Sequence, residues 1–184
     1  MVQITDGTGK GRKARVNSNN ELNVHAVSNP PMQQESEEFG NAYIWSSGVH
    51  NATAGDTVLL IKNTADGLLH IDRVLIANGS TASRYDIHIP STIVATPAGT
   101  ANTGTNLNTT SGNTANAVAK VDETTNSQGD LIGQVYMAVD TNYVLDLRGL
   151  FLGKNESIGV DVAETASETS VTIYGHYIKY VAGT

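Results

Sequence analysis

Cysteine is absent from the sequence, which excludes disulfide frameworks, thiolate zinc sites and cysteine nucleophiles. Charge is sparse and mostly negative, with 11 Lys and Arg residues against 18 Asp and Glu residues and a net charge of −7. A domain that coats nucleic acid carries the opposite balance, so we expect no nucleic-acid partner. No stretch approaches the roughly eighteen apolar residues of a membrane span, and the opening residues lack the apolar core of a secretory signal. We therefore expect a soluble protein that is made in the cytoplasm and binds no membrane.

The sequence is instead rich in glycine and small polar residues. The 184 residues include 18 glycines and many Thr, Asn and Ser residues, a composition that favours strands and turns over helices. The length allows one domain, or one domain with an arm. From residue 42 onward, alternating apolar and polar residues predict nine strands, at 43–46, 57–62, 68–77, 84–89, 117–121, 131–138, 143–147, 157–164 and 170–181. Nine strands suffice for the two sheets of an antiparallel β-sandwich.

The segment RYDIHI shows the clearest alternation of apolar and polar residues. It places Tyr85, Ile87 and Ile89 on one face of the strand and Arg84, Asp86 and His88 on the other. The last strand instead carries bulky residues on both faces. One face of that strand is expected to meet a second layer or another subunit.

The sequence predicts an N-terminal β arm over 1–28, a linker rich in Pro and Glu over 29–41, and a sandwich body over 42–184. Pro30 and Pro31 predict extended backbone in the linker. The arm holds four cations: Lys10, Arg12, Lys13 and Arg15. With Asp6 they give residues 1–15 a charge of +3, which leaves −7 − 3 = −10 for the remaining chain. A β-hairpin ribbon of this size cannot bury a core alone, so it must lean on the body or on another chain. Two readings stay open: the four cations anchor the arm on an acidic neighbour, or they form a solvated hairpin tip.

Inside the body, residues 96–116 form a low-complexity run of small and hydroxylated residues. Such a run cannot bury enough apolar surface to offset its ordering entropy by itself. A loop of this length is either mobile or functional, in contact with a neighbour or a ligand. A second, shorter insertion is expected at 122–130.

Motifs for catalysis and for cofactors are missing. The glycines of DGTGKGRK do not fit a phosphate-binding loop, and the five histidines occur singly, without zinc-ligand spacing. Asp86 shares a strand face with His88, as Asp72 does with His70, but no nucleophile elbow accompanies either pair. Calcium at Asp130, Asp140 and Asp146, which border loops, stays open without an EF-hand pattern. We expect no enzyme activity, no cofactor and no metal site.

Aromatic residues make up 5% of the chain. Trp45, Tyr174 and Tyr180 are candidate ligand or interface aromatics, because exposed rings can pack against sugar faces. Packing in the core or in an interface is the alternative for the same residues.

Two parts of the sequence resemble a known group of proteins. The opening ITDGTGKGRKARVNSNNELNVHAV resembles the DGTG…A.V…L.V.A segment near the N-terminus of many tailed-bacteriophage virion proteins. The segments LLHIDRVLIANGS and ESIGVDVAETASETSVTIYGHYIKY are similar to the jelly-roll-like domains of phage head-decoration, head-fibre and tail accessory proteins. The resemblance implies a structural role without an active site. It also implies a homotrimer, partners such as the major capsid protein, and a place in the virion.

Together these observations predict an all-β protein with a jelly-roll-like antiparallel β-sandwich and an N-terminal β-hairpin arm. The expected function is that of a virion structural protein, for capsid decoration or as a head or tail accessory. The alternative is a carbohydrate- or receptor-binding module that uses the loop ends and exposed aromatics, with a glycan as its partner.

Overall fold

The computed structural model describes residues 15–16, 22–23, 31–89, 99–123 and 129–178. The chain divides into two units, 1–30 and 31–184. The first unit contains an antiparallel pair, β1 (Arg15–Val16) and β2 (Leu22–Asn23), with Val16 opposite Leu22. The predicted N-terminal hairpin is therefore present.

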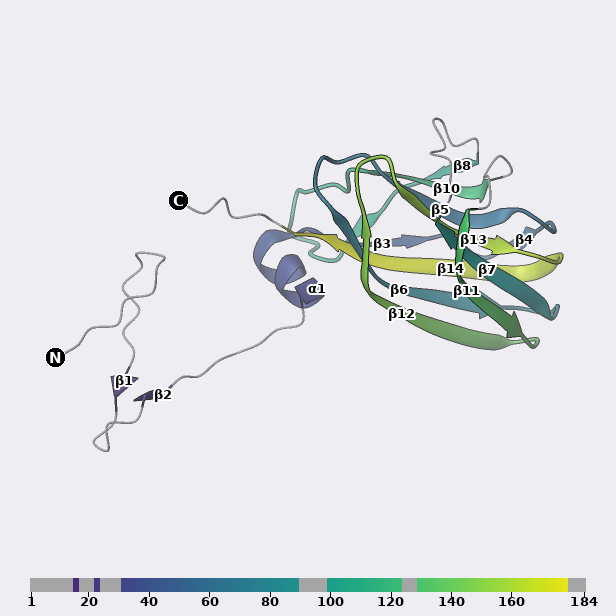
Figure 1. The fold of residues 1–184 in the computed structure, drawn as a ribbon, viewed down its shortest axis with the longest axis horizontal. Coiled ribbons are helices and arrows are strands. Elements are labelled where there is room, and N and C mark those ends of the chain that lie inside the picture. The colour runs from purple at the N-terminus through teal and green to yellow at the C-terminus, as the bar shows by residue number, and fades with distance from the viewer. Residues whose placement is uncertain (1–14, 17–21, 24–30, 90–98, 124–128, 179–184) are drawn as a thin grey trace. The chain divides into compact units, whose positions relative to one another are not determined.

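The second unit is a sandwich of two antiparallel sheets, which confirms the predicted fold class (Figure 1). Sheet one has the order β11 (Asp130–Met137), β7 (Ser83–Ile89), β13 (Ser157–Val162), β5 (Thr57–Asn63), β10 (Ala117–Glu123) and β8 (Thr100–Asn102). Sheet two has the order β12 (Thr141–Leu152), β6 (Leu69–Asn78), β14 (Ala166–Tyr177), β3 (Ala42–Ser46) and β9 (Thr105–Asn106), and β4 (His50–Ala52) also pairs with β14. All nine predicted strands are present, but β12 ends five residues after its predicted end and β14 begins four residues before its predicted start. The short strands β4, β8 and β9 carry no clear signal in the sequence.

The strands pair in the manner of a folded ribbon. Strand β5 pairs with β13, β6 with β12, β7 with β11, and β8 with β10, so an early stretch of chain pairs with a later one in reverse order. Consecutive strands β5, β6 and β7 alternate between the two sheets. This winding is that of a jelly roll. Strand β14 then enters sheet two between β6 and β3.

The core lies between the inward faces of the two sheets. Because successive side chains point to opposite faces of a strand, each strand directs one row of apolar side chains into this core. The buried side chains include Leu59, Ile61, Tyr85, Ile87, Ile158 and Val160 from sheet one and Tyr43, Trp45, Leu69, Ile71, Val74, Ile76 and Ile173 from sheet two. The predicted inward face of β7 is thus confirmed at Tyr85 and Ile87. The other face of β7 is also shielded from solvent, because Asp86 and His88 are buried.

The segment expected to be an extended linker contains helical turns, α1 (Pro31–Gln34) and η1 (Glu35–Phe39). The expectation of extended backbone here was wrong at Pro31, because proline fits the first position of a helix, where its missing N–H costs nothing. These turns are bonded to the body: the Asn108 Nδ2 donates to the Ser36 carbonyl at 3.0 Å, and the Tyr177 N–H donates to the Asn41 carbonyl at 3.0 Å.

The polar run predicted as a loop over 96–116 has a defined structure from residue 99. Strand β8 pairs with β10, and β9 pairs with β3. Asparagine side chains replace an apolar core: Asn106 Nδ2 donates to the Gly40 and Asn113 carbonyls at 2.7 and 2.9 Å, and Asn113 Nδ2 donates to the Phe39 carbonyl at 2.9 Å. Side-chain hydrogen bonds to backbone are how Asn fixes turns without apolar burial. Most of the second predicted insertion, residues 124–128, lies outside the described residues.

Candidate functional site

Of the four predicted arm residues, only Arg15 belongs to the described part of the chain. Lys10, Arg12 and Lys13 lie outside the described residues. Arg15 begins β1, and its backbone pairs with Asn23. Their role as assembly residues stays a prediction.

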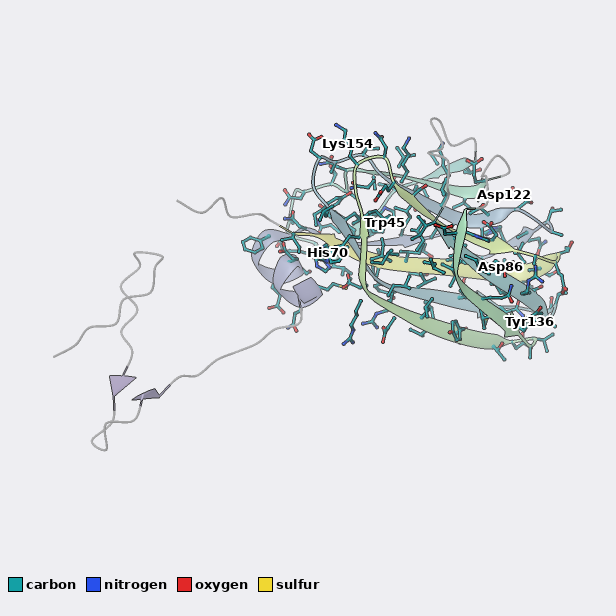
Figure 2. The ribbon with its side chains drawn as sticks, in the orientation of Figure 1. Trp45, His70, Asp86, Asp122, Tyr136 and Lys154 are labelled. Atoms are coloured by element: carbon teal, nitrogen blue, oxygen red, sulfur yellow. The ribbon has the colours of Figure 1, made fainter. Side chains whose placement is uncertain are left out.

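The predicted aromatic platform does not form around Trp45. The Trp45 ring is fully buried between the sheets, with its centroid 5.9 Å from that of Tyr43 (Figure 2). Gly104 lies so close that a Cβ there would be 2.4 Å from Trp45 Nε1. Tyr174 belongs to the opposite face of sheet two, half-buried, with the Arg73 guanidinium 5.5 Å from its ring centre. Tyr180 lies outside the described residues.

The two sheets end on the same side in long edge strands, β11 and β12. These strands follow each other in the chain and contact each other. Each has a single neighbouring strand among the described residues, β7 for β11 and β6 for β12. The two strands and their turn carry large apolar side chains that are between 44% and 71% exposed, namely Leu131, Tyr136, Val139, Val144 and Phe151. Figure 2 shows Tyr136 near one end of β11. We call this surface the β11–β12 edge.

A second candidate is a hollow of about 490 Å³ beside the C-terminal end of β14. Its polar and aromatic lining comes from Asn41, Tyr43, Asn113, Thr114, Asn116 and Tyr177. The Tyr177 hydroxyl donates to the Asn116 carbonyl at 2.8 Å and to Asn63 Oδ1 at 3.2 Å, which fixes the ring. Sequence reasoning missed this hollow because its residues come from four separate segments, although four of the residues, Gly112, Asn113, Thr114 and Asn116, lie in the long polar run.

Two histidines pack side by side on the outward face of sheet two. His70 lies directly opposite His176 in the register of β6 and β14, with ring centres 4.8 Å apart. His176 Nδ1 is 2.8 Å from Asp72 Oδ2, and the Phe151 ring packs edge-on against His70. Burial lowers the pKa of His70, the nearby His176 lowers it further, and Asp72 partly opposes both effects. His70 therefore resists protonation in the folded protein.

Acid should destabilise the fold through His70. The unfolded side chain titrates near its ordinary pKa of 6.5 and the folded one titrates lower, so the unfolded chain binds more protons as the pH falls through 6.5. The free energy of unfolding then rises with pH in this window, and its His70 contribution is complete above 6.5. We expect a lower Tm at pH 5.5 than at pH 7.5, with a smaller difference in His70→Gln, measured by circular dichroism. An identical difference in the two proteins would contradict this account.

Asp86 and His88 lie on the same face of β7, as predicted, but they bind different partners. His88 Nε2 lies 3.5 Å from Asp161 Oδ2 on the neighbouring strand, whereas Asp86 Oδ1 accepts a hydrogen bond from Gln134 Nε2 at 2.8 Å. Neither ring nitrogen of His88 has a hydrogen-bond partner within the part of the chain that is described. Catalysis by a triad needs a nucleophile hydrogen-bonded to the histidine, and no described residue takes that position.

The described residues contain neither a metal-binding cluster nor a membrane-spanning helix. Among them, no group of three or more His, Asp or Glu side chains is placed to hold a metal ion, and Asp130, Asp140 and Asp146 form no such group. Within the same residues, no helix has the length and apolarity needed to cross a membrane.

Comparison with known proteins gives no family. No protein-family model matches the sequence, and no curated protein matches it.

Proposed function

We propose that the protein is a non-enzymatic structural component of a tailed-bacteriophage virion, for capsid decoration or as a head or tail accessory. It assembles with copies of itself, as a homotrimer, and with another virion protein such as the major capsid protein. The observation that carries the proposal is the β11–β12 edge, where two sheets end side by side with exposed apolar side chains. The jelly-roll winding and the resemblance of the N-terminal segment to virion proteins support it.

A free edge strand offers its backbone N–H and C=O groups to a strand from another chain. On β12, Thr141 to Asp146 pair residue by residue with Asn78 to Arg73 of β6, so this stretch is regular. A bulge follows between Asp146 and Leu150, where Gly149 has a φ of 105°. Because a bulge interrupts the ladder, we place the added strand along 141–146, where the exposed Val144 gives it an apolar contact.

The N-terminal unit is the strand donor in this mechanism. It pairs as a small β ribbon and forms a unit distinct from 31–184. Residues 1–15 carry +3 while the rest of the chain carries −10. Opposite charges attract the arm to a neighbouring body, and salt at about 0.15 M already screens such attraction beyond about 8 Å.

Neutralising the arm tests this assembly. We expect wild type to form a discrete oligomer at low salt, by native mass spectrometry and by light scattering. The variant with Lys10, Arg12, Lys13 and Arg15 all changed to Gln should shift to monomer, and high salt should produce the same shift in wild type. Lower occupancy of the variant on purified particles should accompany it.

The matched control removes four positive charges from the body instead. Its substitutions are Arg73→Gln, Lys120→Gln, Lys154→Gln and Lys179→Gln, none of which lies on β11 or β12. The mass of this variant should equal that of wild type. A wild-type protein that stays monomeric at all concentrations, or an arm variant that keeps the wild-type mass, would overturn the proposed self-assembly.

A further inference from the structure

The hollow beside β14 is lined by residues that hydrogen bonds hold in place. Tyr177 forms one wall, its hydroxyl fixed by Asn63 and Asn116, and its ring packs edge-on against the buried Tyr43 at 6.0 Å between ring centres. Another part of the lining is the end of the polar run, held to residues 39–41 by hydrogen bonds from Asn113 Nδ2. A volume of about 490 Å³ lies within the usual range of ligand sites, roughly 300 to 1,000 Å³.

The hollow offers polar groups that the fold leaves unused. Thr114, Asn116 and Asn41 line it, and the Thr114 hydroxyl, the Asn116 side-chain amide and Asn41 Nδ2 have no hydrogen bond to another described residue. Thr114 and Asn116 are exposed. They supply both donors and acceptors. A ligand with several hydroxyl groups would match them.

No residue that lines the hollow has a side chain charged at neutral pH. Burial raises the pKa of the Tyr177 hydroxyl, so this group stays protonated. The chain as a whole carries −7, which disfavours anionic ligands. The lining therefore offers no ion pair to a charged ligand and suits a neutral one.

We propose that this hollow binds an uncharged saccharide, with an aromatic wall from Tyr177 and hydrogen bonds from Thr114, Asn116 and Asn41. The exposed lining of the hollow is mostly polar, which suits a ligand with many hydroxyl groups, and a few convergent polar groups fix the orientation of a bound ligand. The site is separate from the β11–β12 edge. On sheet two, Tyr177 lies opposite Leu69 at one end of β6, whereas the regular part of β12 lies opposite the other end.

The test begins with the full-length wild-type protein on an array of neutral and sialylated or sulfated glycans. The best neutral glycan is then titrated by isothermal calorimetry. We expect saturable binding to neutral glycans, and an affinity at least tenfold weaker for the double variant Thr114→Ala, Asn116→Ala. Because both side chains are exposed and make no packing contact with the core, this variant should fold as wild type does.

A blocking variant and a control complete the design. Gly112 lines the hollow, and a Cβ there would meet no atom within 4 Å, so Gly112→Phe should fill the hollow and abolish binding. The control Thr103→Ala, Thr109→Ala changes two exposed threonines outside the hollow and should bind as wild type does. Absence of saturable binding to any neutral glycan would overturn the proposal. So would binding to anionic glycans alone, or wild-type affinity in the Thr114 and Asn116 variant. None of these outcomes changes the oligomer mass, so this test is independent of the assembly test.

Discussion

Changing Trp45 to alanine should lower the free energy of unfolding by about 3–5 kcal/mol, the usual cost of truncating a large buried aromatic side chain. The ring is fully buried, touches Tyr43, and fills the space that Gly104 and Gly175 leave beside it. Neither glycine can supply atoms to fill the resulting cavity. Urea unfolding followed by circular dichroism measures the change.

Two comparisons separate this prediction from a general effect of losing an aromatic ring. Trp45→Phe should cost less than Trp45→Ala, because it keeps part of the buried volume. Tyr136→Ala, at a side chain that is 71% exposed, should cost less than about 1 kcal/mol. If Trp45→Ala were as stable as Tyr136→Ala, Trp45 would not be a core residue and the ligand-platform reading would return.

The second large effect is expected at Asn63, the last residue of β5. Its side chain is buried and uses both ends of its amide. Nδ2 donates to the Gly67 and Leu152 carbonyls at 2.8 and 2.9 Å, and Oδ1 accepts from the Ala65 N–H at 3.0 Å and from the Tyr177 hydroxyl. These hydrogen bonds connect the turn after β5 to the ends of strands in both sheets.

Asn63→Ala should lower the free energy of unfolding by about 3 kcal/mol or more. Each buried donor or acceptor that loses its partner costs about 1–3 kcal/mol, and this change leaves several at once. Asn142→Ala, at an exposed asparagine on β12, should stay within about 0.5 kcal/mol of wild type. Urea denaturation of the two variants checks this. A loss below about 1 kcal/mol for Asn63→Ala would show that water replaces the amide and that the cluster does not hold the turn.

The proposed sugar site depends on the same asparagine. Because Asn63 Oδ1 accepts from the Tyr177 hydroxyl, its loss should loosen the aromatic wall as well as the fold. This is why the binding test uses Thr114 and Asn116, whose side chains hold nothing else in place. Affinity and stability are then measured on different residues.

The strands were predictable because their signal is local. Period-two alternation and turn residues placed nine strands to within a few residues, and the RYDIHI pattern gave the correct inward face for Tyr85 and Ile87. The short strands β8 and β9 gave no such signal. Their residues are polar and bury little, so only pairing with β10 and β3 makes them strands.

The candidate sites were mostly not predictable from the sequence. Trp45 looked suitable for a ligand platform, but whether an aromatic faces the core or solvent depends on which sheet its strand joins and on what covers it. His176 and Asp72 are 104 residues apart and meet only because β14 enters between β6 and β3. The polar run could not be read as structured, because its order comes from asparagine amides bonded to carbonyls more than sixty residues away.

The sequence by itself determined the fold class, the strands, and the acidic body with a basic arm, because composition and period-two patterning are properties of neighbouring residues. The tertiary structure decided the jelly-roll pairing of the strands, the burial of Trp45, the two histidines in contact, the β11–β12 edge and the hollow beside Tyr177. Each of these depends on contacts between segments far apart in the chain. Such contacts are fixed by the packing of two sheets, and no local pattern records them.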